Sequence, residues 1–414
     1  MRIVIFKEII QMAFHTLRNH KLRSFLTLLG IMIGVMTVIG MVSVIQGLNR
    51  TFISELESIG ADVIIIKKTS PIETMKHTES ERTRKDMTLE DAEALERECK
   101  TIKGVALNLA TNIFENIPVK YHNTKTHDAI ILGMNEKFPR ILSVYYPVEG
   151  RFFIEADVIH RTKVCVLGSE LNDILFPHTQ AVGKKIRIGP EKFRVIGVLA
   201  KRGSMFGQSQ DNIIGIPITT LMKYFPYNLS ELELTTAPKE HEKLEDALEE
   251  ITNILRKRRK IPFGKPNDFH ISTQGSILEL YNEITGAVFL VMIFISSIGL
   301  LVGGIGVMNV MLVSAKERIR EIGIRKAIGA RSSDILNQFL VEAVFLTGTG
   351  GILGILMGAA IALIVRTATP LPASVTLWSV LLGLFVSITV GLFFGIYPAR
   401  RAAKFDPIIS LRYE

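Results

Sequence analysis

Residues 284–315 read ITGAVFLVMIFISSIGLLVGGIGVMNVMLVSA and contain no charged side chain. A helix needs about 20 mainly apolar residues to cross the hydrocarbon core of a bilayer, and buried helices of soluble proteins rarely stay uncharged beyond about 14. This run of 32 residues is therefore predicted to span a membrane. Because it is longer than a bilayer requires, we expect the helix to continue outward as a stalk through residues 276–283.

Three further uncharged runs occupy residues 25–45, 343–365 and 375–397. Each has about the length of a transmembrane helix. No Ala-x-Ala cleavage site follows the first run, so we expect it to remain as a signal anchor. The predicted fold is an integral membrane α-helical protein with a large α+β domain outside the membrane. Its four transmembrane helices are predicted at residues 25–46, 284–315, 339–366 and 374–398.

The formal net charge of +9 is concentrated beside these helices. Residues 1–24, 316–338 and 398–414 together hold an excess of nine positive charges, and the rest of the chain is balanced. All three segments lie on one side of a four-span topology, and cytoplasmic loops of membrane proteins are rich in Lys and Arg. Both termini and the loop 316–338 are therefore predicted to be cytoplasmic, with residues 47–283 outside. We expect these basic segments to lie against the lipid membrane, and we expect no nucleic-acid partner.

The two ends of the chain belong to this cytoplasmic side. Residues 1–24 place apolar side chains at helical spacing with cations between them, which is typical of an amphipathic helix on the membrane surface. The alternative is that these residues simply begin the first transmembrane helix. Residues 399–414 are predicted to form a cytoplasmic tail.

The large segment between the first and second transmembrane helices has an α+β pattern. Units of strand, helix and strand stand at its two ends, at residues 61–109 and 231–272. In the first unit, Thr88 and Asp91 have the spacing of a capping box at the start of a helix. The polar residues 69–87 before them are expected to be a mobile loop.

These two units lie far apart in the sequence, so we predict that they pair into one subdomain of residues 47–109 and 229–283. Residues 110–228 between them are rich in strands, with turn signals at Gly183 and at Gly189. This segment is predicted to be a second, inserted subdomain.

No catalytic or metal-binding pattern is visible. Both Gly-Lys pairs of the chain that resemble a phosphate-binding loop lack its upstream glycine, and the zincin-like HEKLE at His241 has Glu245 in place of the second histidine. We therefore predict no catalytic residue, cofactor or metal site, and no enzyme. Cys99 and Cys165 could pair outside the cell, but we interpret them as two buried small hydrophobes.

The loop between the second and third transmembrane helices predicts a short helix with an apolar stripe. The stripe and the charges beside it are Ile319, Ile322 and Lys326, with Arg318, Glu321 and Arg325. Gly329 can end this helix in the left-handed conformation, and Ser332 or Ser333 can cap the next one. A helix of this kind suits docking into a groove of a cytoplasmic partner. The alternative is a solvated connector.

Glu342 stands one residue before the uncharged run of the third transmembrane helix. A carboxylate at this depth is costly unless it is paired or reaches water. It could pair with cations of the loop or reach the membrane interface, and we favour the interface.

Glycines recur at four-residue spacing in the transmembrane helices, which allows helix backbones to approach closely in lipid. The predicted packing residues are Gly30, Gly34, Gly299, Gly303, Gly350, Gly354, Gly358, Gly391 and Gly395. The alternative is that membrane helices are simply rich in glycine.

Four stretches of the sequence resemble the MacB-type, FtsX-like permeases of ABC transporters. They are ERIREIGIRKAIGARSSDILNQF (317–339), GIYPARRAAKFDP (395–407), LRSFLTLLGIMIGV (22–35) and GRFF (150–153). The resemblance covers the whole chain in order, and the loop motif is specific.

The resemblance implies that two permease copies pair, identical or paralogous, and that each docks a cytoplasmic ATPase which binds ATP and Mg²⁺. The docking residues would be Glu317, Arg318, Ile319, Glu321, Ile322, Arg325, Lys326 and Gly329 of this sequence. It also implies a Porter and an inserted Sabre subdomain outside a bacterial inner membrane, and a periplasmic or extracellular adaptor. Fused macrolide exporters carry an N-terminal ATPase that this sequence lacks, so we expect an ATPase in trans.

Three functions remain open at this point. The first is efflux of a drug, peptide or other substrate from the outer side, through movement of the outer domain on ATP binding and hydrolysis. The second is lipoprotein release by the same four-span plan. The third is a membrane-anchored sensor or interaction protein without transport.

Overall fold

The computed structural model describes residues 21–59, 62–70, 83–111, 117–205, 207–240, 243–369 and 372–411. Most of the predicted amphipathic segment, residues 71–82 of the polar segment and His241 lie outside these residues. The chain forms two compact units. The membrane unit comprises Met1–Thr51 and Asn282–Glu414, and the outer unit comprises Phe52–Tyr281.

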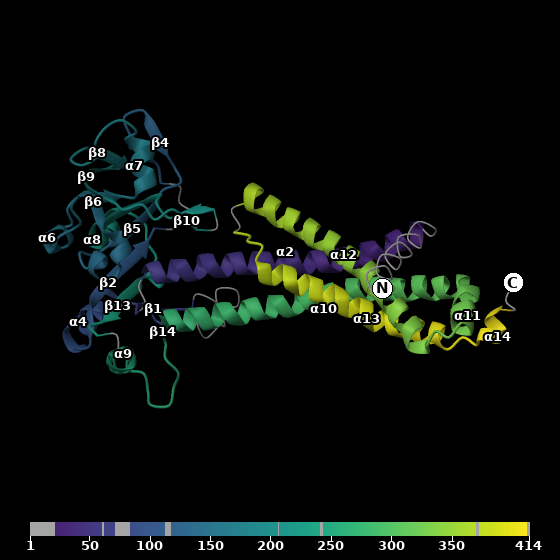
Figure 1. The fold of residues 1–414 in the computed structure, drawn as a ribbon. Helices are drawn as coiled ribbons and strands as arrows, with labels where there is room; N and C mark the ends of the chain where they lie inside the picture. The colour runs from purple at the N-terminus through teal and green to yellow at the C-terminus, as the bar shows by residue number, and fades with distance from the viewer. Residues whose placement is uncertain are drawn as a thin grey trace. The chain divides into compact units, whose positions relative to one another are not determined.

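Four described helices are long and apolar enough to cross a membrane, which confirms the four predicted spans. They are α2 (Lys21–Ile59), α10 (Gln274–Glu317), α12 (Ser332–Ala368) and α13 (Leu377–Ala403) (Figure 1). Because α10 begins at Gln274, residues 276–283 are continuous with the second span, as the length of the uncharged run predicted. The short helices α11 (Ile319–Ala327) and α14 (Pro407–Leu411) follow α10 and α13.

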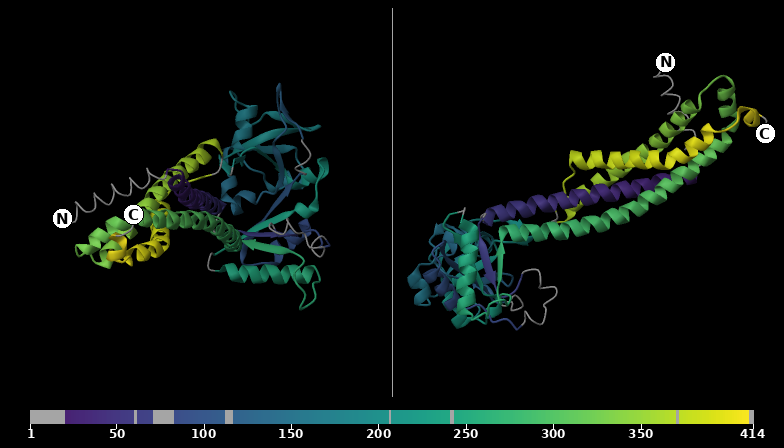
Figure 2. Two further views of the ribbon diagram at one scale, coloured as in Figure 1. Left: turned by 90° about the vertical axis from the view of Figure 1, so that its right-hand side faces the viewer. Right: turned by 90° about the horizontal axis from the view of Figure 1, so that it is seen from below.

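The transmembrane helices meet at the predicted glycines. A Cβ atom on Gly30 of α2 would lie 2.8 Å from the Cα atom of Gly303 in α10, so only a residue without a side chain allows this approach. Likewise, a Cβ on Gly395 of α13 would lie 2.7 Å from the Cβ of Ala343 in α12, and these two helices run side by side (Figure 2). At each of the nine predicted glycines, an added Cβ would lie within 4 Å of an atom of another helix, although at Gly299 this would be an ordinary contact of 3.5 Å.

The two strand–helix–strand units of the outer unit interleave in one sheet. Their elements are β1 (Ile64–Lys67), α4 (Leu89–Glu98) and β2 (Ile102–Ala110), then β13 (Glu233–Pro238), α9 (Leu244–Arg258) and β14 (His270–Thr273). The strands pair in the order β14-β1-β13-β2, with every neighbour antiparallel. This is the split βαβ arrangement of ferredoxin-like folds. The Thr88 capping box is present as predicted, with Asp91 at its third position.

Residues 110–228 continue this sheet, because β2 pairs with β5. The sheet has 12 strands, and beyond β2 the order is β5-β12-β7-β9-β8-β3-β4, with β6 also paired to β9. Their bounds are β3 (Val119–Tyr121), β4 (Thr124–Thr126), β5 (Ile130–Met134), β6 (Pro147–Gly150), β7 (Val164–Leu167), β8 (Lys185–Ile188), β9 (Glu191–Leu199) and β12 (Ile213–Pro217). The other elements are α5 (Phe138–Ile141), α6 (Glu155–Ile159), α7 (Ser169–Leu175), α8 (Ile218–Tyr224), the hairpin β10 (Ser204–Met205) and β11 (Gln208–Ser209), and the 3-10 helices Ser143–Tyr145 and Leu229–Glu231.

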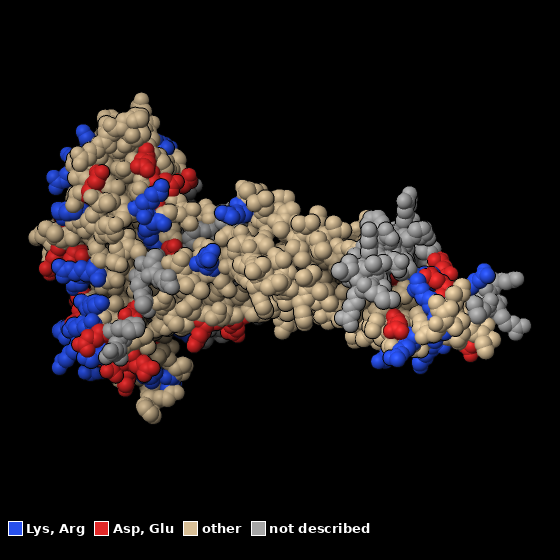
Figure 3. All heavy atoms as spheres, viewed as in Figure 1, with Lys and Arg blue, Asp and Glu red and all other residues tan. Residues whose placement is uncertain are grey.

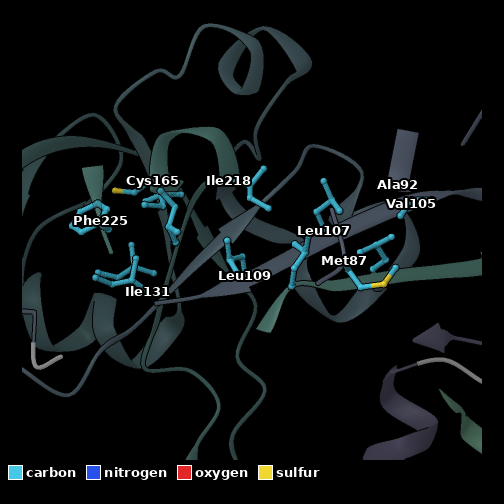
Figure 4. Close-up of a cluster of buried hydrophobic side chains, with 14 of the residues drawn as sticks. Met87, Ala92, Val105, Leu107, Leu109, Ile131, Cys165, Ile218 and Phe225 are labelled. Atoms are coloured by element: carbon cyan, nitrogen blue, oxygen red, sulfur yellow. The ribbon is translucent and has the colours of Figure 1, made fainter. Parts of the chain in front are cut away.

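A hydrophobic core runs along this sheet and joins its two halves. Leu107 and Leu109 of β2 lie in the same cluster as Ile131 and Phe225 of the insert (Figure 4). Cys165 and Cys99 belong to it as well. Both cysteines are free and buried, which confirms their interpretation as small hydrophobes, and burial raises the pKa of both thiols.

The end of the polar segment 69–87 is packed. Met87 is fully buried, and Arg259 donates hydrogen bonds to the carbonyl oxygens of Lys85 (2.6 Å) and Asp86 (3.2 Å). The prediction of a mobile loop is therefore wrong for residues 85–87, because a distant arginine holds them.

Candidate functional site

Arg318 links the end of α10 to α12. Its guanidinium donates to Glu342 of α12 over 3.0 Å and to Glu321 of α11 over 2.9 Å. Glu342 is only 3% exposed. An unpaired carboxylate at such a position would be strongly unfavourable, so the ion pair accounts for its presence. The prediction that Glu342 reaches the interface is wrong, and its pairing with a loop cation is the arrangement found.

Arg325, one turn further along α11, makes a second link to α12. It donates to Glu321 over 2.6 Å and to Gln338 of α12 over 2.6 Å. Burial would raise the pKa of Glu321, but the hydrogen bond and charge of Arg318 and the charge of Arg325 lower it below its usual value. The carboxylate therefore stays ionised between two arginines.

Lys326 holds α11 to the end of α13. Its ammonium donates to the carbonyl oxygens of Ala403 (2.6 Å) and Phe405 (2.9 Å). These carbonyls lie at the C-terminus of α13, where a cation satisfies unpaired acceptors and complements the helix dipole. The chain continues from there into α14, which packs against α11 (Figures 1 and 2).

Ile322 faces inward. It is 2% exposed and packs in a cluster with Ile335 and Phe339 of α12 and Ala399 of α13. The predicted docking stripe through Ile322 is therefore wrong, because this side chain lies in the core of the membrane unit.

The exposed face of α11 is a different stripe. Ile324 is 47% exposed and Ile328, just after the helix, is 81% exposed. With Arg320 they follow the spacing i, i+4, i+8, which places them on one helix face. Figure 3 shows that Lys and Arg side chains gather over the end of the membrane unit that carries α11 and α14. This stripe of one cation and two isoleucines is the exposed surface of α11.

Gly329 ends α11 with a φ of +104°, as predicted. The cap of α12 differs from the prediction. The carboxylate of Asp334 accepts a hydrogen bond of 2.9 Å from the backbone N–H of Arg331, and neither Ser332 nor Ser333 is the cap because both lie inside the helix. The carboxylate thus satisfies a backbone donor at the start of the helix.

Two family models match the chain. The model described as MacB-like periplasmic core domain matches residues 24–254, and the model described as FtsX-like permease C-terminal matches residues 293–407. This chain belongs to the MacB-type, FtsX-like ABC transporter permeases.

Curated relatives agree with this assignment. The permease is 33% identical to "Macrolide export ATP-binding/permease protein MacB" of Bdellovibrio bacteriovorus, over 98% of this chain and 62% of the relative. It is 34% identical to the protein of the same name from Hyphomonas neptunium, over 98% of this chain and 61% of the relative. The permease therefore spans about three fifths of the length of these relatives.

Among solved structures, the periplasmic region of MacB from Actinobacillus actinomycetemcomitans is similar at 18% identity, with a TM-score of 0.45. That similarity covers 56% of this chain and 97% of the solved one.

The contacts of α11 lie within the FtsX-like match, from Arg318 to Phe405. Sequence patterns single out the charged residues of this loop but not their partners. A charged Glu342 next to an apolar run was the one signal for the Arg318 ion pair. No sequence pattern predicts the Lys326 contacts, because their acceptors are backbone carbonyls, which every residue carries. Within the described ranges, no group of three His, Cys, Asp or Glu side chains could hold a metal ion.

Proposed function

We propose that this permease converts ATP binding and hydrolysis by a partner ATPase into movement of its outer unit. The loop helix α11 docks in a groove of the ATPase and passes the motion of that subunit to the transmembrane helices. ATP and Mg²⁺ bind to the partner, and this chain supplies no catalytic residue or cofactor.

The way in which α11 is held supports the proposal most directly. Arg318 and Arg325 tie it to α12, and Lys326 ties it to the end of α13. A force on α11 therefore reaches two transmembrane helices through short polar contacts. A solvated connector would need none of these contacts, whereas a helix that transmits motion from the ATPase must be fixed to the transmembrane helices.

The rest of the assembly follows from charge and family. The concentration of cations beside the spans supports a cytoplasmic location for both termini and α11, with the outer unit outside a bacterial inner membrane. Two permease copies pair in the membrane and act with a periplasmic or extracellular adaptor. The relatives are named for macrolide export, which supports efflux of a drug, peptide or similar substrate from the outer side.

The test is recovery of the ATPase with variants of the exposed stripe. Ile324→Asp puts a charge into an apolar contact, so ATPase co-purification should fall by about 30-fold, the size of a typical hot-spot loss. The matched control is Ile159→Asp, which makes the same change at an isoleucine of the outer unit that is 64% exposed. The control should recover the ATPase normally. Normal recovery with both Ile324→Asp and Ile328→Asp would overturn the assignment of this surface.

A further inference from the structure

A groove of about 320 Å³ lies where α10 ends, α11 begins and α13 ends. Its wall includes Leu312 and Val313 of α10 and Ile319 of α11. Two cations line it as well, Lys316 from the end of α10 and Arg401 from the end of α13. Both are exposed, and no acidic side chain lines the groove.

The groove crosses the boundary between the apolar and charged parts of the membrane unit. Leu312 and Val313 belong to the uncharged run of 32 residues, and Lys316 is the first charged residue after it. On α13, Arg401 follows the uncharged run 375–397 by one turn of helix. The cations therefore stand at headgroup level, and the apolar wall stands at the level of the acyl chains.

Neighbouring cations of the same loop are already engaged. Arg318 and Arg325 bind carboxylates of this chain, and Lys326 binds backbone carbonyls. Across the described residues, Lys316 and Arg401 make no ion pair. Two such cations that converge on one groove attract an anion, since each can donate several charge-assisted hydrogen bonds to phosphate oxygens.

We propose that this groove binds an anionic phospholipid, with its headgroup phosphate between Lys316 and Arg401 and one acyl chain against Leu312 and Val313. Basic pockets between transmembrane helices bind acidic headgroups in this way. The apolar wall favours a lipid over a free phosphate, because a free anion would gain nothing from it. The site requires only that these helices span a membrane. Its placement in the cytoplasmic leaflet rests on the proposed orientation.

A bound lipid would also connect two elements of the loop site. The groove is lined by Ile319 at the start of α11 and by Phe405, whose carbonyl oxygen accepts from Lys326. Lipid in the groove therefore contacts both the first turn of α11 and the segment between α13 and α14.

The experiment is lipid binding to the purified full chain in detergent, measured by native mass spectrometry with phosphatidylglycerol and with phosphatidylcholine of the same acyl chains. Phosphatidylglycerol should bind at least about fivefold more tightly, since one cation near a membrane surface contributes about that factor. Lys316→Gln combined with Arg401→Gln should weaken phosphatidylglycerol binding by about 25-fold. Lys316→Arg should bind as the native chain does.

The matched control removes the same number of positive charges from positions beside the groove. Arg400→Gln combined with Lys404→Gln changes two exposed cations of the same helix end that do not line it, and should leave binding within about twofold. Val313→Trp fills the groove and keeps both cations, so it should weaken phospholipid binding while the cations remain.

Three results would overturn the proposal. One is equal binding of the two lipids by the native chain. Another is an equal loss in the control pair, which would indicate diffuse surface charge. The third is glycerol phosphate competing as strongly as the intact lipid, which would indicate a free-phosphate site. Loss of lipid binding with normal ATPase recovery would leave the docking proposal untouched, so the two proposals fail separately.

Discussion

Helix α9 of the outer unit and helix α11 of the membrane unit are both held by arginine, but they differ in what else holds them. Helix α9 has 15 residues and buries Ala247, Ile251, Ile254 and Leu255 against the core. Helix α11 has nine residues and buries Ile322 and Gly323. A helix of that length is unstable alone. The position of α11 therefore depends mainly on polar contacts, whereas the position of α9 depends on hydrophobic burial with an arginine added.

The two arginines show the same difference. Arg259, at the end of α9, is 8% exposed and binds Asp91 (3.1 Å) and Asp268 (2.7 Å) within a packed domain. Arg318 joins a short loop helix to one transmembrane helix. Removal of Arg259 should therefore weaken the whole outer unit, and removal of Arg318 should release a single element.

The largest effect is expected for Arg259→Met. This change leaves Asp91 buried with a weaker set of partners, and breaking a buried ion pair lowers the free energy of unfolding by about 3 kcal/mol. The free thiols of Cys99 and Cys165 are buried in the outer unit, so their labelling in rising urea measures its unfolding. The control is Arg97→Met, where the side chain is 74% exposed and the loss should stay within about 0.5 kcal/mol. An equal loss in the free energy of unfolding for both variants would show that Arg259 contributes no more to the stability of the outer unit than an exposed arginine.

A smaller, local effect is expected for Arg318→Met. Loss of its charged hydrogen bonds should lower the free energy of opening of α11 by about 2 kcal/mol, and its amides should exchange with solvent about 30-fold faster. Thiol labelling of the outer unit should not change. Arg320→Met, at an exposed position on the same helix, is the control and should leave amide exchange unaltered. Faster thiol labelling with Arg318→Met would show that the two units do not respond separately.

The smallest effect concerns Glu250 of α9, whose carboxylate accepts from Thr101 Oγ1 (2.6 Å), from the backbone N–H of Lys100 and from Cys99 Sγ. The hydrogen bond from Thr101 is the main cause that lowers its pKa from 4.5 to about 2. A lowered folded-state pKa stabilises the fold above pH 4.5, and that stability is lost as the pH falls toward 2. Because the group is largely solvated, we expect only about 1 kcal/mol.

Glu250→Gln should remove this dependence. Its free energy of unfolding should approach that of the native chain near pH 2 and lie about 1 kcal/mol below it at pH 7, measured by urea unfolding followed by circular dichroism at each pH. A difference that is constant from pH 2 to pH 7 would contradict the assigned pKa.

Much of the fold was predictable because its signals are local. The uncharged run 284–315 identifies a span by length alone, and Thr88 with Asp91 identifies a helix start by spacing alone. The polar segment 69–87 was misjudged at its end, because the arginine that holds residues 85–87 lies about 170 positions further along the chain.

The loop site was predictable in place but not in orientation. Isoleucines stand at 319, 322 and 324 of α11 and at 328 just after it, so two different stripes are apolar. Helical periodicity alone does not choose between them. The choice is made by Ile335, Phe339 and Ala399, which come from two other helices and enclose Ile322.

By itself, the sequence determined the four transmembrane helices, their close-packing glycine faces and the order of elements in the outer unit, because run length, four-residue spacing and capping residues act within a few turns of chain. The tertiary structure alone decided that β1 lies between β13 and β14, that Glu342 is paired with Arg318, and that Ile322 faces inward. These are contacts between segments distant in sequence, and such contacts depend on which surfaces meet when the chain packs.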